Sequence, residues 1–235
     1  MSEQLIYSGK AKDVFSTDND SELLMVYKDQ ATAFNGERKE HIPGKGQLNC
    51  KISSYIFDYL IKNGIKTHLV KNLSDHEQLV LKTELIPVEV VLRNKIAGSF
   101  AKKFALEEGK NLPEPIIEFY YKSDALDDPF INDNQITSLE IATEDELNYI
   151  KDQTRKINQL LIKLFAQDSL DLVDFKLEFG RVNGEIILID EFSPDNCRLW
   201  DHNTHTSLDK DVFRKNQADL VETYQKVLNR LEGAK

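Results

Sequence analysis

The sequence predicts an α+β fold. Residues 172–180 alternate apolar and polar side chains without a break, and an apolar strand follows after a short link, which is typical of an antiparallel hairpin. Short apolar runs separated by turn residues dominate the first third of the chain. Longer stretches with helical periodicity lie between and after these strands. The 235 residues allow one large domain or two lobes.

The hairpin separates charged from apolar side chains. One face of its first strand carries Val173, Phe175, Leu177 and Phe179, and the other carries Asp174, Lys176 and Glu178. Its second strand, residues 186–189, ends in the acidic pair Asp190 and Glu191. Both charge signs therefore lie on the polar face.

The link between the two strands decides which face Asp190 takes. A two-residue turn at Asn183 and Gly184 would place Asp190 and Glu178 on opposite faces. A three-residue loop over 182–184, with Gly184 in the left-handed conformation, would place them on the same face. We favour the three-residue loop. The shared face can then hold a divalent cation and a polyanion.

The elements before the hairpin are predicted in the following order. Strands are expected at 5–7, 12–15, 23–27, 67–71, 78–83 and 88–94, with a further strand in the loop-like segment 116–121. A helix should begin near Gly46 and end at Asn63-Gly64, a good C-terminal cap. A shorter helix is expected over 99–108.

Two long helices complete the prediction. One begins at Thr143, where Thr143 and Glu146 form a capping box, and its apolar stripe is Leu147, Ile150, Thr154, Ile157, Leu161 and Leu164. The other runs over 209–231, with Phe213, Leu220, Tyr224, Val227 and Leu231 facing inward. No linker rich in Pro, Gly or Ser separates the halves, so two lobes would pack tightly, with a boundary near 84–88.

The composition excludes several classes of protein. A net charge of −10 argues against non-specific nucleic-acid binding. The two cysteines suggest neither a metal site nor a disulfide framework. The sequence starts without the pattern of a signal peptide, and no apolar run is long enough to span a bilayer. We therefore expect a cytoplasmic protein without a membrane partner.

Three segments outside the hairpin are candidates for chemistry. The glycine turn over 8–12 carries two lysines and can cover nucleotide phosphates, although a plain hairpin would look the same. Arg93, with Gly98-Ser99 at a helix start, can bind a phosphate, although an ordinary strand and N-cap would also fit. The polar segment 193–201 is interpreted as a loop in which Arg198 can bind an anion and Asp195 an amine or hydroxyl.

Other familiar chemistry is missing from the sequence. The five histidines, His41, His68, His76, His202 and His205, have no nucleophile partner and no zinc spacing. There is no nucleophile elbow, Walker A loop or dinucleotide fingerprint. The residues alone therefore predict a magnesium–nucleotide site, with Glu178 and Asp190 as metal ligands, beside a separate anion pocket.

Several segments resemble one enzyme family. Residues 86–94 with Ala97-Gly98-Ser99 resemble the first signature of the SAICAR synthetase family of de novo purine biosynthesis, and 172–180 resemble the second. Shorter family-like segments lie at 9–12, 43–46, 127–129 and 190–195, in the same order. The resemblance covers nearly the whole chain, and the length matches the compact bacterial form.

The resemblance implies an ATP-dependent ligase. The family joins L-aspartate to the carboxylate of 5-amino-1-(5-phosphoribosyl)imidazole-4-carboxylate (CAIR), giving SAICAR, ADP and phosphate through an acyl phosphate, with Mg²⁺ as cofactor. It also implies a two-lobed fold of antiparallel sheets with flanking helices, similar to ATP-grasp and kinase lobes, with ATP in the cleft. Residues 1–84 would cover the nucleotide, and 85–235 would hold the metal and ribonucleotide sites. A homodimer is expected on the same basis.

The resemblance also implies roles for individual residues. Lys10, Ala11 and Lys12 would cover the nucleotide phosphates, Lys82, Glu84 and Ile86 would face the adenine, and Glu178 and Asp190 would bind Mg-ATP. Arg93, Ser99 and Arg198 would hold the ribonucleotide phosphate, while Glu89 and the catalytic pair Asp174 and Lys176 would approach the imidazole and its carboxylate, with Lys122 and Asp195 nearby.

The chain departs from the family pattern in two places. Asn35 stands where many relatives carry an acid, which puts an acid or metal role at this position in doubt. Asn196-Cys197 replaces a small pair before Arg198. Two rival functions remain open at this point: a small-molecule kinase with similar lobes, and a non-catalytic nucleotide-binding regulator.

Overall fold

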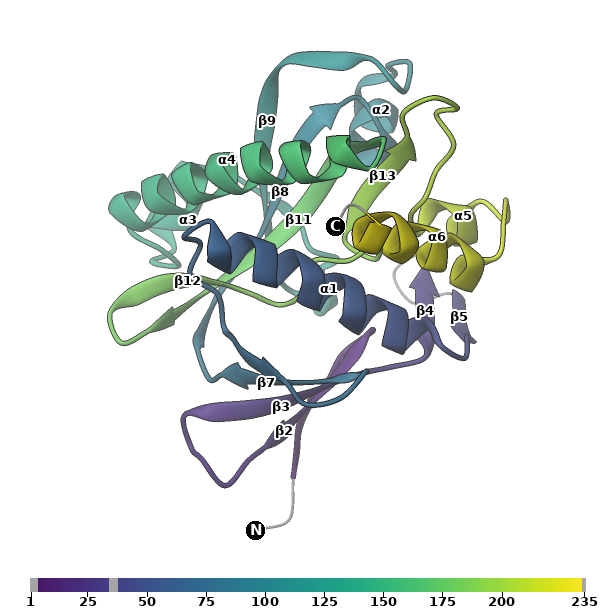
Figure 1. Ribbon diagram of the computed structural model, residues 1–235. Helices are drawn as coiled ribbons and strands as arrows, with labels where there is room; N and C mark the ends of the chain where they lie inside the picture. The colour runs from purple at the N-terminus through teal and green to yellow at the C-terminus, as the bar shows by residue number, and fades with distance from the viewer. Residues whose placement is uncertain (1–3, 34–37, 234–235) are drawn as a thin grey trace.

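Two antiparallel sheets form the framework of the protein (Figure 1). The computed structural model describes residues 4–33 and 38–233 of the chain. The smaller sheet has the strand order β1-β2-β3-β7-β6. Its strands are β1 (Leu5–Ser8), β2 (Lys12–Ser16), β3 (Glu22–Tyr27), β6 (Leu69–Asn72) and β7 (Glu77–Leu81). A separate hairpin pairs β4 (Gln30–Ala33) with β5 (Arg38–His41).

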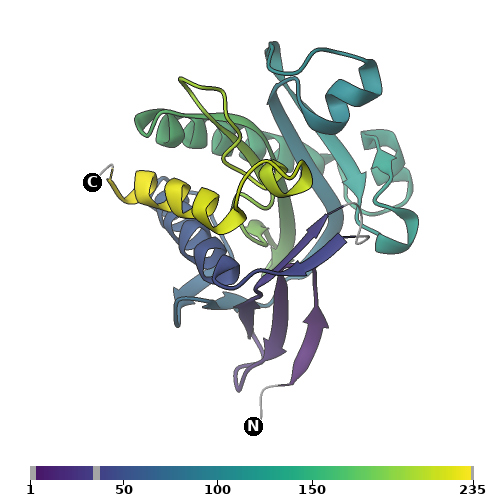
Figure 2. The ribbon, with the colours of Figure 1, turned by 90° about the vertical axis from the view of Figure 1, so that its right-hand side faces the viewer.

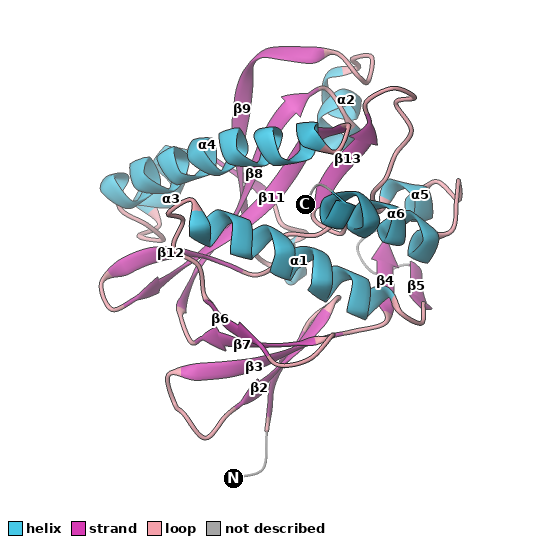
Figure 3. Cartoon of the chain, in the orientation of Figure 1, coloured by secondary structure: helices cyan, strands magenta, loops and turns pink. Residues whose placement is uncertain are grey.

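The larger sheet has the order β10-β9-β8-β11-β12, and β13 pairs with β11. Its strands are β8 (Glu84–Lys95), β9 (Asn111–Tyr121), β10 (Phe130–Ile131), β11 (Leu170–Val182), β12 (Glu185–Ile189) and β13 (Cys197–Asp201). The helices are α1 (Lys45–Lys62), α2 (Gly98–Phe104), the 3₁₀ helix η2 (Asp124–Leu126), α3 (Asp133–Ser138), α4 (Glu144–Gln167), α5 (Asp211–Arg214) and α6 (Leu220–Gly233). Figure 3 shows the two sheets in magenta and the helices in cyan.

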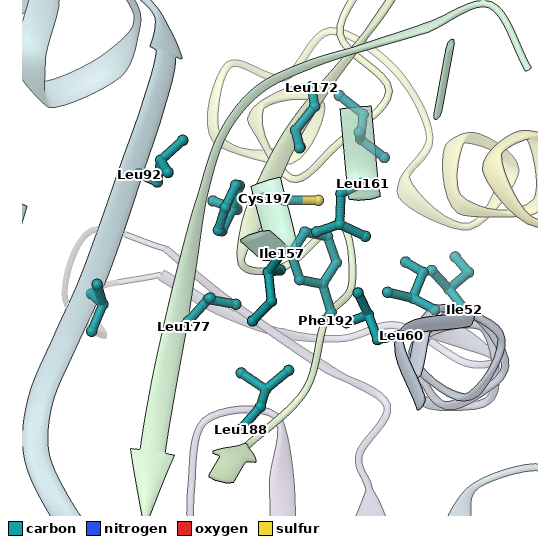
Figure 4. Packing of buried hydrophobic residues seen from close by; sticks show 14 of the residues in the cluster. Ile52, Leu60, Leu92, Ile157, Leu161, Leu172, Leu177, Leu188, Phe192 and Cys197 are labelled. Carbon is teal, nitrogen blue, oxygen red and sulfur yellow. The ribbon is translucent and has the colours of Figure 1, made fainter. Parts of the chain in front are cut away.

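Helices α1, α4 and α6 lie together on one side of the larger sheet (Figure 2). The apolar face of β11, with Phe175, Leu177 and Phe179, packs in the main core with Ile52 and Leu60 of α1, as Figure 4 shows in part. The six stripe residues predicted for α4 are all buried, as are the five predicted for the last helical region. Helix α1 therefore shares its core with the larger sheet, although it lies in the first third of the chain.

The capping residues in the sequence predicted some helix ends correctly and others not. Thr143 and Glu146 form the predicted capping box, and α1 ends at Lys62 with Asn63 as its C-cap, followed by Gly64 with φ of +78°. The expected helix over 209–231 is instead divided into α5 and α6, with Asn216 in the left-handed conformation between them. The expected helix over 99–108 ends at Phe104, because Ala105 takes the left-handed conformation.

Two further predictions need correction. Residues 193–201 are not all loop, because Cys197–Asp201 forms β13 and pairs with the start of β11. The link in the hairpin is a two-residue turn: Val182 pairs with Glu185, and Asn183 and Gly184 have φ of +50° and +77°. Asn-Gly suits such a turn because both central residues need positive φ, which matches the twist of the flanking strands.

The predicted division into residues 1–84 and 85–235 stays a prediction. The smaller sheet falls before residue 84 and the larger sheet after it. Cys50 of α1 also packs with Met25, Tyr27 and Val80 of the smaller sheet, so α1 contacts both cores. No helix among the described residues is long and apolar enough to cross a membrane.

Candidate active site

A cavity of about 1140 Å³ brings residues of the two sheets together. The smaller sheet and its loops contribute residues 7–12 with Leu23, Met25 and Val80. The larger sheet contributes Glu89, Val91 and Arg93 from β8 and Asp174, Lys176 and Glu178 from β11. The predicted alternation of these two strands is therefore confirmed, since the charged faces line the cavity while the apolar faces fill the core.

The register of β8 and β11 sets neighbouring charges opposite one another. Glu178 pairs with Glu89, and Asp174 pairs with Arg93 across the two strands. The Lys176 ammonium lies between the acids: Nζ is 3.0 Å from Oε1 of Glu89 and 3.7 Å from Oδ2 of Asp190, and it donates a hydrogen bond to Glu178. Burial alone would lower the pKa of Lys176, but these carboxylates raise it well above its ordinary value. Lys176 is therefore a fixed positive charge.

The Asp190 side chain lies in the same cavity as Glu178 because of a backbone conformation that the sequence did not suggest. Ile189 pairs with Glu178, so regular alternation would turn the next residue to the other face. Asp190 instead has φ of +69°, a left-handed conformation that aspartate tolerates better than most residues. Glu178 and Asp190 therefore face the same cavity, as predicted. The left-handed conformation of Asp190 places them there, and not the predicted three-residue loop.

Lys12 links the glycine turn to the acidic pair. Its ammonium forms an ion pair with Asp190, and it lies 3.1 Å from Oε1 of Glu191. Burial would raise the pKa of Asp190, but the Lys12 and Lys176 ammonium groups outweigh it and hold the pKa well below its usual range. Lys122 donates to Glu178 at 2.8 Å. Asp190, Glu191 and Glu178 are therefore each paired with a lysine.

The opposite end of the cavity carries two arginines around one carboxylate. Arg93 Nη1 and Arg198 Nη1 both donate to Oδ2 of Asp174, at 3.0 and 2.8 Å. Arg93 Nη2 donates to the Ser99 hydroxyl at 3.1 Å. Gly98 has φ of +56°, and a Cβ placed there would lie 2.3 Å from Arg198 Nη2. Glycine therefore lets the chain approach the Arg198 guanidinium closely.

Asp195 anchors the loop that carries Arg198. Its carboxylate forms an ion pair with the fully buried Lys45 and accepts hydrogen bonds from Asn49 Nδ2 at 2.9 Å and the Tyr224 hydroxyl at 2.7 Å. The Lys210 ammonium lies 3.8 Å from Oδ1 of Asp195. Helices α1 and α6 thereby fix the position of this loop.

The expectation for the adenine contacts stays a prediction. Lys82, Glu84 and Ile86 are not among the residues that line the cavity, whereas Leu81, Thr83 and Leu85 are. Ile86 is fully buried in the core, and Glu84 forms an ion pair with Arg181. The other predicted site residues all line the cavity; Asn35 lies outside the described residues.

The donor set at the acidic end suits Mg²⁺ bound together with phosphate. No group of three or more His, Cys, Asp or Glu side chains among residues 4–33 and 38–233 is arranged to hold a metal ion alone. Glu178 and Asp190 offer two carboxylates that both approach Lys176 Nζ. Mg²⁺ commonly takes one or two carboxylates and completes its shell with substrate phosphates and water. The residues therefore fit a metal that arrives with a nucleotide.

The comparisons with known proteins identify the family. The SAICAR synthetase family model matches residues 5–231. The chain belongs to the SAICAR synthetase family. A phosphoribosylaminoimidazole-succinocarboxamide synthase of Latilactobacillus sakei is 62% identical over 231 residues, which cover 98% of this chain and 96% of the relative. The family resemblance predicted from the two signatures is thus confirmed.

Solved structures of SAICAR synthetases share the fold. The crystal structure of the synthase from Ehrlichia chaffeensis matches with a TM-score of 0.96 and 45% identity, covering 97% of this chain and 98% of that one. A SAICAR synthetase in complex with ADP matches with a TM-score of 0.94 and 46% identity over 97% of both chains. The predicted α+β fold class is therefore confirmed.

Sequence reasoning missed several residues at this SAICAR synthetase cavity. His68, Glu191, Lys210 and Arg214 line it, and Lys45 supports it from behind. Lys45 lay in a family-like segment and Glu191 followed Asp190, so position in the sequence offered a signal for these two. His68 offered none, because its contacts come from a distant segment of the chain.

Proposed function

We propose that this chain is an ATP-dependent ligase that joins L-aspartate to the carboxylate of CAIR and releases SAICAR, ADP and phosphate in purine biosynthesis. The family match and the relatives named as phosphoribosylaminoimidazole-succinocarboxamide synthase support a ligase of this kind. One observation in the structure carries the proposal for the site: Asp174, Lys176 and Glu178 on β11 connect the lysine-rich acidic end of the cavity to its arginine end.

The acidic end is proposed to bind Mg-ATP. The glycine turn with Lys10, Ala11 and Lys12 would cover the phosphates, and the apolar residues Leu23, Met25 and Val80 offer a surface for the adenine. The related SAICAR synthetase solved with ADP supports a nucleotide in this fold. Glu178 and Asp190 would hold Mg²⁺, which when bound neutralises phosphate charge and polarises the γ-phosphoryl group.

The arginine end is proposed to bind CAIR. Arg93, Ser99 and Arg198 would contact its phosphate, since arginine donates paired hydrogen bonds to phosphate oxygens. Glu89, Asp174 and Lys176 would then face the imidazole and its carboxylate, with Lys122 and Asp195 at the sides. Alternate residues on a strand are about 6.6 Å apart, so Lys176 lies within reach of both ends.

The proposed chemistry proceeds in two steps. A carboxylate oxygen of CAIR attacks the γ-phosphorus, and ADP leaves with the bond electrons, giving an acyl phosphate. The aspartate nitrogen then attacks the acyl carbon, loses a proton and displaces inorganic phosphate. Lys176 offsets the repulsion as the two anions approach each other and stabilises charge that develops during transfer.

The aspartate dependence of ADP release tests this function. The ligase should release ADP with CAIR and ATP at a substantial rate only when L-aspartate is also present, in a coupled assay. D-aspartate and L-asparagine serve as matched controls. Equal ADP release with and without L-aspartate would instead indicate the small-molecule kinase, which the comparisons do not favour, and no release under any condition would indicate a nucleotide-binding regulator.

The remaining expectations belong to this proposal. We place the enzyme in the cytoplasm, with ATP, CAIR and L-aspartate as small-molecule substrates and no nucleic-acid or membrane partner. A homodimer stays a prediction from the family resemblance. Both cysteines are free and buried, in keeping with a reducing compartment.

A further inference from the structure

His68 is a buried histidine that the proposed chemistry does not use. It precedes β6 and is 5% exposed, and its ring packs edge-on against Phe57 of α1, with centroids 5.8 Å apart. Its Nε2 atom lies 2.9 Å from the main-chain oxygen of Asp190. Because a carbonyl oxygen only accepts, Nε2 carries the proton and donates this hydrogen bond.

The main chain of His68 joins the two sheets at the same place. Its amide donates to the Leu188 carbonyl at 2.9 Å, and its carbonyl accepts from the Leu81 amide at 2.7 Å. Leu188 in turn donates to the Lys66 carbonyl at 3.0 Å. Residues 66–68 are therefore held against the end of β12, so the imidazole meets Asp190 from a fixed position.

The hydrogen bond from His68 is made to Asp190, whose backbone conformation is unusual. Asp190 has φ of +69°, and regular strand geometry after Ile189 would send its carboxylate away from Glu178. A non-glycine residue in this conformation needs surrounding contacts that favour it. The His68 ring donates a hydrogen bond to the main-chain carbonyl of Asp190, while the Lys12 ammonium pairs with the Asp190 carboxylate.

We propose that His68 is a positioning residue: its Nε2–H holds the Asp190 main chain in the left-handed conformation that directs the carboxylate toward Glu178 and the metal–nucleotide end of the cavity. This inference rests on the proposed function, since it concerns the carboxylates assigned to Mg²⁺ there. Partners that orient a metal-binding carboxylate indirectly typically change metal affinity by about 10- to 100-fold when removed.

His68→Phe tests the hydrogen bond, because phenylalanine keeps a ring against Phe57 but has no donor. ADP affinity is measured by equilibrium titration without turnover, in excess Mg²⁺ and in EDTA. In wild-type protein Mg²⁺ should strengthen ADP binding. The Mg²⁺ gain is the ratio of the ADP affinity in Mg²⁺ to the ADP affinity in EDTA. In His68→Phe this gain should fall about 10-fold or more, while ADP affinity in EDTA changes less than about 2-fold.

A second pair of variants tests the same hydrogen bond if the His68→Phe protein does not fold. His68→Gln and His68→Met have side chains of similar length, and only glutamine offers a donor. The glutamine variant should keep more of the Mg²⁺ gain than the methionine variant. His76→Phe changes an exposed histidine in the loop between β6 and β7 and should leave the gain unchanged.

A double-mutant cycle separates an effect through Asp190 from general loosening of the site. In an Asp190→Asn background, His68→Phe should no longer change the Mg²⁺ gain, because the carboxylate on which it acts is absent. A full wild-type gain in His68→Phe, an equal gain in the glutamine and methionine variants, or an equal loss of affinity in Mg²⁺ and in EDTA would overturn the inference. ADP binding to wild-type protein that does not depend on Mg²⁺ would instead contradict the proposed metal site.

Discussion

Lys176→Ala is expected to reduce turnover by about 100- to 1000-fold, the range seen when one preorganised group that stabilises transition-state charge is removed. Lys176 lies among Glu89, Glu178 and Asp190, where the CAIR carboxylate and the γ-phosphate are proposed to meet. Its ammonium offsets the repulsion between these anions mainly as they close, so the loss should fall on kcat. ADP affinity in Mg²⁺ should change by less than about 5-fold.

Controls distinguish this effect from damage to the fold. Lys122 and Lys12 remain paired with Glu178 and Asp190 in the variant, so neither acid is left without a lysine. Lys66→Ala removes a lysine that is 59% exposed and should leave kcat unchanged. A Lys176→Ala enzyme with the kcat of wild type, or one in which ADP affinity falls as much as kcat, would contradict the proposed role.

Arg198→Ala is expected to weaken CAIR binding by about 1.5–3 kcal/mol, because it removes a charge-assisted contact with the ribonucleotide phosphate. The variant leaves no acid unpaired: Asp174 keeps its bond from Arg93, and Asp211 keeps its bond from Arg214. ADP affinity should stay close to wild type, since the nucleotide is proposed to bind at the other end of the cavity. Equilibrium titrations with each ligand measure the two effects separately.

A second variant tests the same contact without removing the arginine. Gly98→Ala would place a Cβ 2.3 Å from Arg198 Nη2, so the guanidinium has to move. CAIR affinity should fall, while ADP affinity should not. Arg155→Ala, which removes an exposed arginine on α4, is the matched control. If Arg198→Ala lowers ADP affinity and spares CAIR affinity, the assignment of the two ends is wrong.

The parts of the fold that the sequence predicted correctly depend on local signals. Thr143 and Glu146 are three residues apart and cap α4 with their own side chains, so no distant contact is needed. The charged faces of β8 and β11 follow from strict alternation within each strand. These two patterns were enough to predict the central strands and most of the charged residues of the candidate site.

The parts that the sequence did not predict depend on contacts between distant segments. The conformation of Asp190 depends on His68, which is 122 positions away, and on Lys12, which is 178 positions away. β13 forms because Cys197–Asp201 pairs with the first half of β11, whereas the longer segment 193–201 looked like a polar loop.

The transfer of oxygen from CAIR to phosphate is the most direct test of the proposed reaction. CAIR is labelled with ¹⁸O in both carboxylate oxygens, and the products of a single turnover with ATP and L-aspartate are analysed by mass spectrometry. The acyl phosphate route predicts one ¹⁸O atom in inorganic phosphate and one in the new amide carbonyl of SAICAR. Inorganic phosphate without label, formed together with SAICAR that keeps one ¹⁸O, would contradict it, because the carboxylate oxygen would then never have bonded to phosphorus.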